Sequence, residues 1–146
     1  MQVMVLYEPG RAGDAAVDSA RELARATHAS VTLVGLVPQA EGGGPRCGGS
    51  AREYNEAVME QVAAELHLAK RRLGALADDA RVELLIEGAD PPLADWSAAH
   101  HFDTILLPAR RRPLRHVKHP EAARLQRATQ ADVRIIDAHG AGAARF

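Results

Sequence analysis

The stretch that decides the fold is residues 82–108, VELLIEGADPPLADWSAAHHFDTILLP. Its apolar run at 82–88 is typical of a strand, and Asp90 with Pro91 forms a helix start. Residues 103–108 then read as a second strand. Two strands joined by a helix cannot form a hairpin, so they run parallel and the crossover is right-handed. The stretch therefore predicts a parallel β-α-β unit.

The same alternation extends from this unit toward both ends of the chain. Residues 3–7 and 132–137 read as the first and last strands, and the nearly continuous apolar run at 31–38 is typical of a strand covered by helices on both faces. Residues 1–137 are therefore predicted to form one α/β domain, an open parallel five-stranded sheet with helices on both faces, Rossmann-like in class. Residues 138–146 are expected to be a disordered tail.

Three features outside the strands complete this outline. Asp14 is a good N-cap for the helix after the first strand. Residues 39–50 hold five of the 12 glycines and predict a flexible loop. The single Cys47 excludes an internal disulfide, and the N-terminus lacks the basic start of a signal peptide, so we expect a cytoplasmic protein.

Composition limits the classes of partner. The chain has 146 residues, 47% of them hydrophobic and 25% charged, which fits one globular domain. Its longest apolar run, 31–37, is far shorter than the roughly 20 residues of a membrane-spanning helix. The formal net charge is −1, but residues 1–109 hold 9 Lys or Arg against 16 Asp or Glu, whereas 110–146 hold 9 against 3. This asymmetry indicates either an acidic partner or attraction between the two halves of one fold, and without an overall basic balance it does not favour nucleic acid.

The order of elements resembles the universal stress protein family over residues 2 to about 137. VTLVGLVP at 31–38 and IEGADPPLADWSAAHHFDTILLP at 86–108 carry the resemblance, because members of that family show a strand, an E-G-x-P turn, a helix and a strand at the second place. The resemblance implies a stress-response or signalling module that acts through an unknown protein partner. It also implies a homodimer, with 132–137 as its seam.

The resemblance further implies a degenerate nucleotide site. In the family's ATP-binding members an Asp ends the first strand, a Val follows the second, and a motif G-x2-G-x9-G-[S/T] after the fourth strand cradles the phosphates. Here Glu8 stands at the Asp position, and no glycine occurs between Gly88 and Gly140. Pro108 has no N–H to donate, and the glycine that would let backbone N–H groups converge on an anion is missing. The candidate nucleotide or anion residues are Glu8, Val37, Gly88, Arg111 and Arg112.

Two functions remain open. The first is a non-enzymatic module without a cofactor, in which the basic stretch 110–119 is a solvated connection with a secondary role in anion or partner contacts. The second is an ATP- or AMP-binding member, or weak ATPase, that uses 110–119 in place of the glycine cradle through Arg and Lys side chains. His116 and His119 lack a third metal ligand, and no catalytic triad pattern stands out. The sequence therefore favours the first function, with no metal and no catalytic residue.

Overall fold

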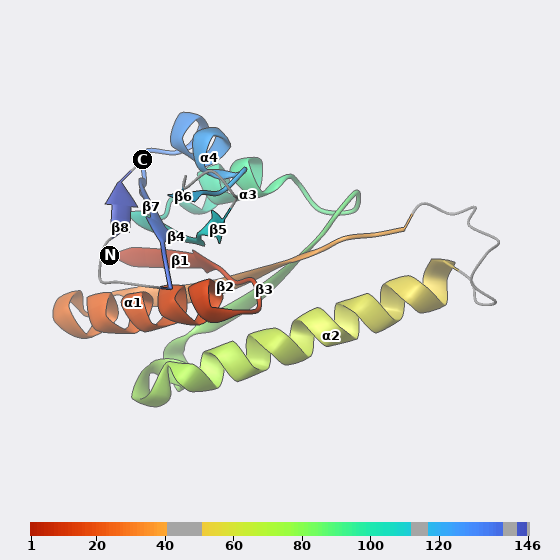
Figure 1. The fold of residues 1–146 in the computed structure, drawn as a ribbon, viewed down its shortest axis with the longest axis horizontal. Helices are drawn as coiled ribbons and strands as arrows, with labels where there is room; N and C mark the ends of the chain where they lie inside the picture. Colours follow the sequence, from red (N-terminus) through yellow and green to blue (C-terminus); the bar gives the residue numbers. More distant parts are fainter. Residues whose placement is uncertain (41–50, 112–116, 139–142, 146) are drawn as a thin grey trace.

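The computed structural model describes residues 1–40, 51–111, 117–138 and 143–145, in which no helix is long and apolar enough to cross a membrane. Figure 1 shows the course of the chain. The elements are, in order, β1 (Gln2–Leu6), α1 (Arg11–Thr27), β2 (Ser30–Val37), α2 (Ala51–Arg72), the 3-10 helix η1 (Gly74–Asp79), β3 (Arg81–Ile86), α3 (Leu93–His100), β4 (Thr104–Pro108), β5 (Arg110–Arg111), β6 (Val117–Lys118), α4 (Ala122–Ala128), β7 (Asp132–Ile136) and β8 (Ala143–Arg145).

The main sheet has the strand order β3-β2-β1-β4-β7-β8, and β5 pairs with β6 in a separate ribbon. From β3 to β7 every neighbouring pair is parallel, which confirms the predicted five-stranded parallel sheet. The chain first builds outward from β1 to β2 and β3, and then places β4 and β7 on the other side of β1. Sheets of this kind bind ligands outside the carboxyl ends of the strands, where the order reverses. The carboxyl end of β1 is therefore the place to look for a site.

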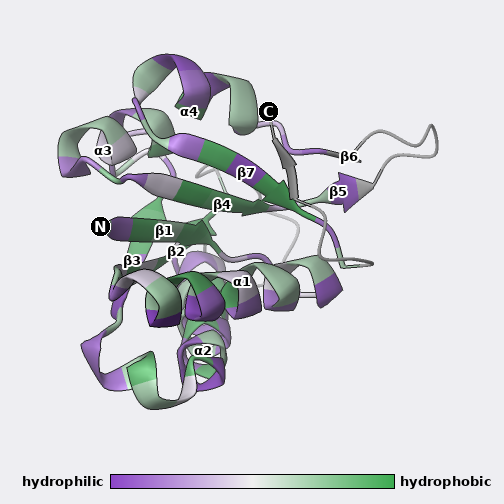
Figure 2. Cartoon of the chain, turned by 90° about the vertical axis from the view of Figure 1, so that its left-hand side faces the viewer, coloured by the Kyte–Doolittle hydropathy of each residue, from purple (hydrophilic) through white to green (hydrophobic). Residues whose placement is uncertain are grey.

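The two faces of the sheet are covered by different helices, α1 with α2 on one face and α3 with α4 on the other (Figure 2). Strand β1 shows why both faces must be covered. Val3 and Val5 belong to the core under α1 and α2, whereas Met4 and Leu6 belong to the core under α3 and α4. Successive side chains of a strand point to opposite faces, so an uninterrupted apolar strand needs two covering layers. The expected helices on both faces are thus present.

Helix α2 packs on the sheet through its C-terminal half. Its buried residues are Leu66 and Ala69, and its N-terminal part extends past β1 (Figure 1). Gly35 of β2 allows the close approach, because a Cβ there would lie 2.8 Å from both Leu66 Cδ1 and Val62 Cγ1. A glycine inside an apolar strand therefore marks the α2 contact.

Two predicted helix caps are wrong, because both aspartates stabilise turns instead. Helix α1 begins after Gly10, and Asp14 lies in its first turn, where it accepts a hydrogen bond from the Tyr7 hydroxyl at 3.2 Å. Helix α3 begins after Pro92, and Asp90 accepts the Ile86 N–H at 2.7 Å. Both carboxylates therefore fix the chain at the carboxyl edge of the sheet, where β1 and β3 end.

The segment after β7 differs from the expected tail where it is described. β8 pairs antiparallel with β7, with Ile135 opposite Ala144 and Ile136 opposite Ala143. The strand 132–137, expected as the dimer seam, therefore has its outer side covered by β8. Residues 139–142 and 146, and all but the first two residues of the predicted loop 39–50, lie outside the described residues.

Candidate functional site

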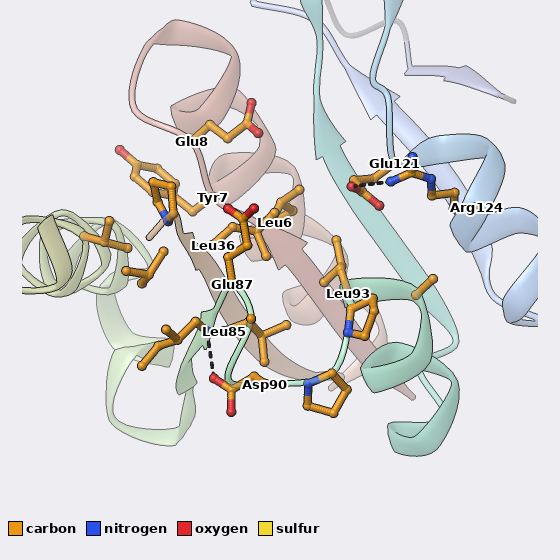
Figure 3. Close-up of a pocket in the computed structure, with 18 of the residues that line it drawn as sticks. Leu6, Tyr7, Glu8, Leu36, Leu85, Glu87, Asp90, Leu93, Glu121 and Arg124 are labelled. Atoms are coloured by element: carbon orange, nitrogen blue, oxygen red, sulfur yellow. Dashed lines mark hydrogen bonds and ion pairs between the residues drawn. The ribbon is translucent and has the colours of Figure 1, made fainter. Parts of the chain in front are cut away.

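A pocket of about 660 Å³ lies at the carboxyl ends of β1, β2 and β3 (Figure 3). This size falls within the range of small-molecule sites. The turns after these strands, the start of α3, one turn of α2 and the region before α4 form its walls. Its apolar lining consists mainly of Leu6, Leu36, Val37, Val62, Leu85, Ile86 and Leu93. The fold thus places an apolar hollow where an open α/β sheet is expected to bind ligands.

Glu8 is held at the rim of this pocket by the backbone around it. It follows β1, and the first turn of α1 folds directly back over it. A Cβ at Gly13 would lie only 1.7 Å from the Glu8 carbonyl oxygen, so glycine is required there for the helix to approach. The position of the Glu8 backbone is therefore set by β1 and α1 together.

The Glu8 carboxylate binds two side chains that follow β4. Arg110 donates to both of its oxygens, through Nε to Oε1 at 2.9 Å and through a terminal nitrogen to Oε2. The ring of His119, whose side chain is fully buried, lies with Nε2 3.0 Å from Oε2. Partial burial raises the pKa of Glu8, but the hydrogen bonds from His119 and Arg110 outweigh it and lower the pKa from 4.5 to about 2. We call Glu8, Arg110 and His119 the Glu8 cluster.

Both ring nitrogens of His119 are occupied. Nδ1 accepts the backbone N–H of Glu121 at 3.1 Å, so the proton of the neutral ring lies on Nε2, from which it is donated to Glu8. A ring in this position has no nitrogen left to act as a general base or a metal ligand. Among the residues that the structure describes, no group of three His, Cys, Asp or Glu could hold a metal ion.

Two further polar groups border the pocket. Arg124 donates to Glu121 at 3.4 Å, so this arginine is paired with a carboxylate, as Arg110 is. The Tyr7 hydroxyl is held by Asp14, and burial together with the charge of Asp14 raises its pKa to about 12. Tyr7 is therefore a neutral donor that is already engaged within the protein.

Comparison with known proteins identifies the fold that carries this pocket. No protein-family model and no curated protein matches the sequence. Among solved structures, universal stress protein UspA from Lactobacillus plantarum superposes with a TM-score of 0.74 at 17% identity, covering 93% of this chain and 97% of that one. A member of the universal stress protein family from Burkholderia pseudomallei gives 0.68 at 19% identity over 92% and 94%. The universal stress protein from Archaeoglobus fulgidus gives 0.62 at 18% over 92% and 91%. The fold is that of the universal stress proteins.

Within this universal stress protein fold, three of the five candidate residues meet at one pocket. Glu8, Val37 and Gly88 all line it, and Gly88 has a φ of 83°, which suits glycine in the turn after β3. Arg111 lies in the short strand β5, but its side chain is outside the described residues, as is the whole of Arg112. The structure therefore brings together the candidates from the first three strands.

The residues that the sequence reasoning missed are Arg110 and His119, the partners of Glu8. Arg110 was one of several cations in the basic stretch, and His119 was considered only as a metal ligand. The positions of these residues in the sequence could have indicated the pairing. Glu8 follows the first strand, and Arg110 follows the strand that is its neighbour in the sheet. In a universal stress protein fold the carboxyl ends of β1 and β4 are adjacent, so such residues meet.

Proposed function

We propose that this chain is a non-enzymatic stress-response or signalling module of the universal stress protein type, which acts through protein contacts and does not bind ATP tightly. The observation that supports this most is the Glu8 cluster. It places an ionised carboxylate at the carboxyl end of β1 and uses the nearest arginine to neutralise it.

A triphosphate at this edge would find its main donors among the described residues already engaged. Arg110 already makes two hydrogen bonds to Glu8, and the Glu121 N–H is taken by His119. Pro108, at the end of β4, has no N–H at all. Moving a phosphate to this place would require breaking the charge-assisted hydrogen bonds between Arg110 and Glu8, and an exposed arginine contact contributes little in return.

A second function has specific support and serves as the alternative. Solved structures of the same fold include a universal stress protein in complex with cAMP, the Archaeoglobus fulgidus protein in complex with dAMP, and an Arabidopsis thaliana family protein with AMP bound, at 15–19% identity. The pocket described here lies at the sheet edge where such folds bind ligands. In this alternative the chain binds ATP or AMP, or hydrolyses ATP weakly, with Arg111 and Arg112 contacting phosphate.

Thermal unfolding with and without Mg-ATP or AMP separates the two functions. A ligand present at 100 times its dissociation constant stabilises the folded state by about 2.7 kcal/mol. The proposal predicts no rise in Tm for either nucleotide at millimolar concentration. A rise of several degrees that saturates with nucleotide would favour the alternative.

The protein contacts that we propose include a second copy of this chain. The resemblance to universal stress proteins implies a dimer seam at the last parallel strand, 132–137, so pairing there would involve β8 or require it to leave β7. We further propose a cytoplasmic location, because a single cysteine suits a reducing compartment.

A further inference from the structure

We propose that the pocket at the carboxyl ends of β1, β2 and β3 binds a small organic cation, an amine or amidine with an apolar body. This inference rests on the proposed function, in which the pocket does not bind ATP tightly. It assigns to that pocket a class of ligand whose charge is opposite to that of a nucleotide.

The shape of the pocket calls for an apolar body. Its volume of about 660 Å³ suits a molecule of one or two rings. Leu6, Leu85 and Leu93 form part of its wall and are almost fully buried, so they give a fixed apolar surface. The prolines at 91 and 92 stiffen the side next to α3. Burying a ring against these walls is favourable without any rearrangement of the core.

The charges that face the pocket call for a cation. Seven charged residues line it, and its two arginines are each neutralised by a carboxylate, Arg110 by Glu8 and Arg124 by Glu121. This leaves three carboxylates, those of Glu65, Glu87 and Asp90, for which the described part of the chain provides no ion pair.

The contacts of these three carboxylates leave their charge uncompensated. Asp90 accepts only the backbone N–H of Ile86 at 2.7 Å, and Glu65 accepts the neutral amide of Gln61 at 3.1 Å. The Glu87 carboxylate makes no hydrogen bond or ion pair within the described residues. The described lining thus presents three negative charges that have no cationic partner among the described residues.

Glu87 is the best placed of the three. In Figure 3 its side chain rises from the turn after β3 and lies in the middle of the pocket, between Tyr7 and Leu93. An ammonium group next to Glu87 would have its apolar body among the leucines, and the Tyr7 ring adds an aromatic surface that favours a nearby cation. Glu65 lies on α2 beside Val62, so a second carboxylate borders the same space.

Three indole compounds of matched size test the ligand class. Tryptamine carries an ammonium, tryptophol a neutral hydroxyl and indole-3-acetate a carboxylate. Binding to the full chain is followed by amide NMR shifts, which also locate the site. We expect tryptamine to bind about fivefold to tenfold more tightly than tryptophol, the gain from one partly exposed ion pair. Indole-3-acetate should bind most weakly, and the amides of Val37, Gly88 and Leu93 should shift.

Two glutamine variants show whether the charge acts locally. Glu87→Gln should reduce the preference for tryptamine over tryptophol to about twofold, because it removes the central carboxylate. Glu60→Gln removes the same charge from an exposed site on α2 outside the pocket and should keep the full preference. Both carboxylates are exposed and have no hydrogen-bond or ion-pair partner among the described residues, so both variants should keep the wild-type Tm.

Three outcomes would overturn the inference: equal affinity for the three indoles, no binding of tryptamine at millimolar concentration, or equal effects of the two variants. The same sample titrated with Mg-ATP distinguishes its failure from that of the proposed function. If neither tryptamine nor ATP binds, only the cation site is wrong. If ATP binds tightly in this pocket, both the inference and the proposed function are wrong.

Discussion

At the scale of single residues, one carboxylate determines what the carboxyl edge can do. The placement of Glu8 where ATP-binding universal stress proteins carry an Asp follows from the resemblance of the sequence to that family. Its partners do not, because a link between residues 8 and 110 depends on the strand order, in which β1 and β4 are neighbours. The burial of His119, which closes the other side of the Glu8 cluster, likewise follows only from the packing of the region before α4.

The Glu8 cluster should make stability depend on pH. The pKa of Glu8 is lowered from 4.5 to about 2 in the folded state, so its contribution is present above about pH 5 and is lost as the pH falls toward 2. Glu8→Gln should reduce the free energy of unfolding by about 1–2 kcal/mol at pH 7, a value that allows for solvent screening of a partly exposed carboxylate. The difference between wild type and variant should shrink between pH 5 and pH 3, as measured by urea unfolding. Glu60→Gln, an exposed control, should show no such trend, and a constant Glu8→Gln difference would contradict the assignment.

Gly13 provides a second test at this scale. In an ordinary helix, replacing glycine by alanine stabilises by about 1 kcal/mol. Here the new Cβ would lie 1.7 Å from the Glu8 carbonyl oxygen, which is backbone and cannot move aside cheaply. Gly13→Ala should therefore destabilise the fold by about 2–3 kcal/mol, an effect of opposite sign. A gain in Tm for this variant would show that α1 does not approach β1 so closely.

At the scale of elements, the periodicity of apolar residues predicts which strands and helices form. The capping residues predict where the helices begin less well. The five parallel strands follow from the apolar runs, and the helices on both faces follow from the crossovers that parallel strands need. The starts of α1 and α3 do not, because Asp14 and Asp90 resemble N-caps in sequence but bind Tyr7 and the Ile86 N–H in the structure. An aspartate near a helix start can serve either the helix or the turn before it, and tertiary contacts decide between them.

The contact between α2 and β2 can be tested at Gly35. Gly35→Ala brings a Cβ to 2.8 Å from the ends of Leu66 and Val62, so it should destabilise by about 1–2 kcal/mol. Val62→Ala removes one of the two obstructing methyl groups. The double variant should be more stable than the sum of the two single changes predicts, as measured by a double-mutant cycle in urea. Strict additivity would mean that Val62 is not part of this contact.

At the scale of the whole molecule, the charge asymmetry of the sequence corresponds to a contact between its acidic and basic parts. Residues 1–109 are acidic and 110–146 basic, and the two halves meet where Arg110 and His119 bind Glu8. Of the two explanations of this asymmetry, attraction between the two halves of one fold is therefore supported by the ion pair between Arg110 and Glu8. The pairing of β8 with β7 could not be predicted, since three small or charged residues near a chain end carry no strand pattern.

The proposed dimer seam makes a prediction at this scale. Removing residues 139–146 deletes β8 and leaves the outer backbone edge of β7 unpaired. An exposed strand edge favours pairing with a second copy. The truncated chain should therefore show a larger dimer fraction than the full chain by sedimentation velocity at tens of micromolar, roughly the range of a modest affinity. If both forms are monomers under these conditions, strand 132–137 is not the seam.

The central claim is that the Glu8 cluster leaves no tight phosphate site at the carboxyl edge. Calorimetric titration of the full chain with Mg-ATP, at about 0.15 M salt so that exposed charges are screened, tests it most directly. We predict no saturable binding in the micromolar range, and any weak signal should disappear at a few hundred millimolar salt, an order-of-magnitude expectation from screening. A micromolar dissociation constant for ATP, much weaker binding of AMP or pyrophosphate, and loss of binding in Arg111→Ala would contradict the claim and establish a rebuilt nucleotide site.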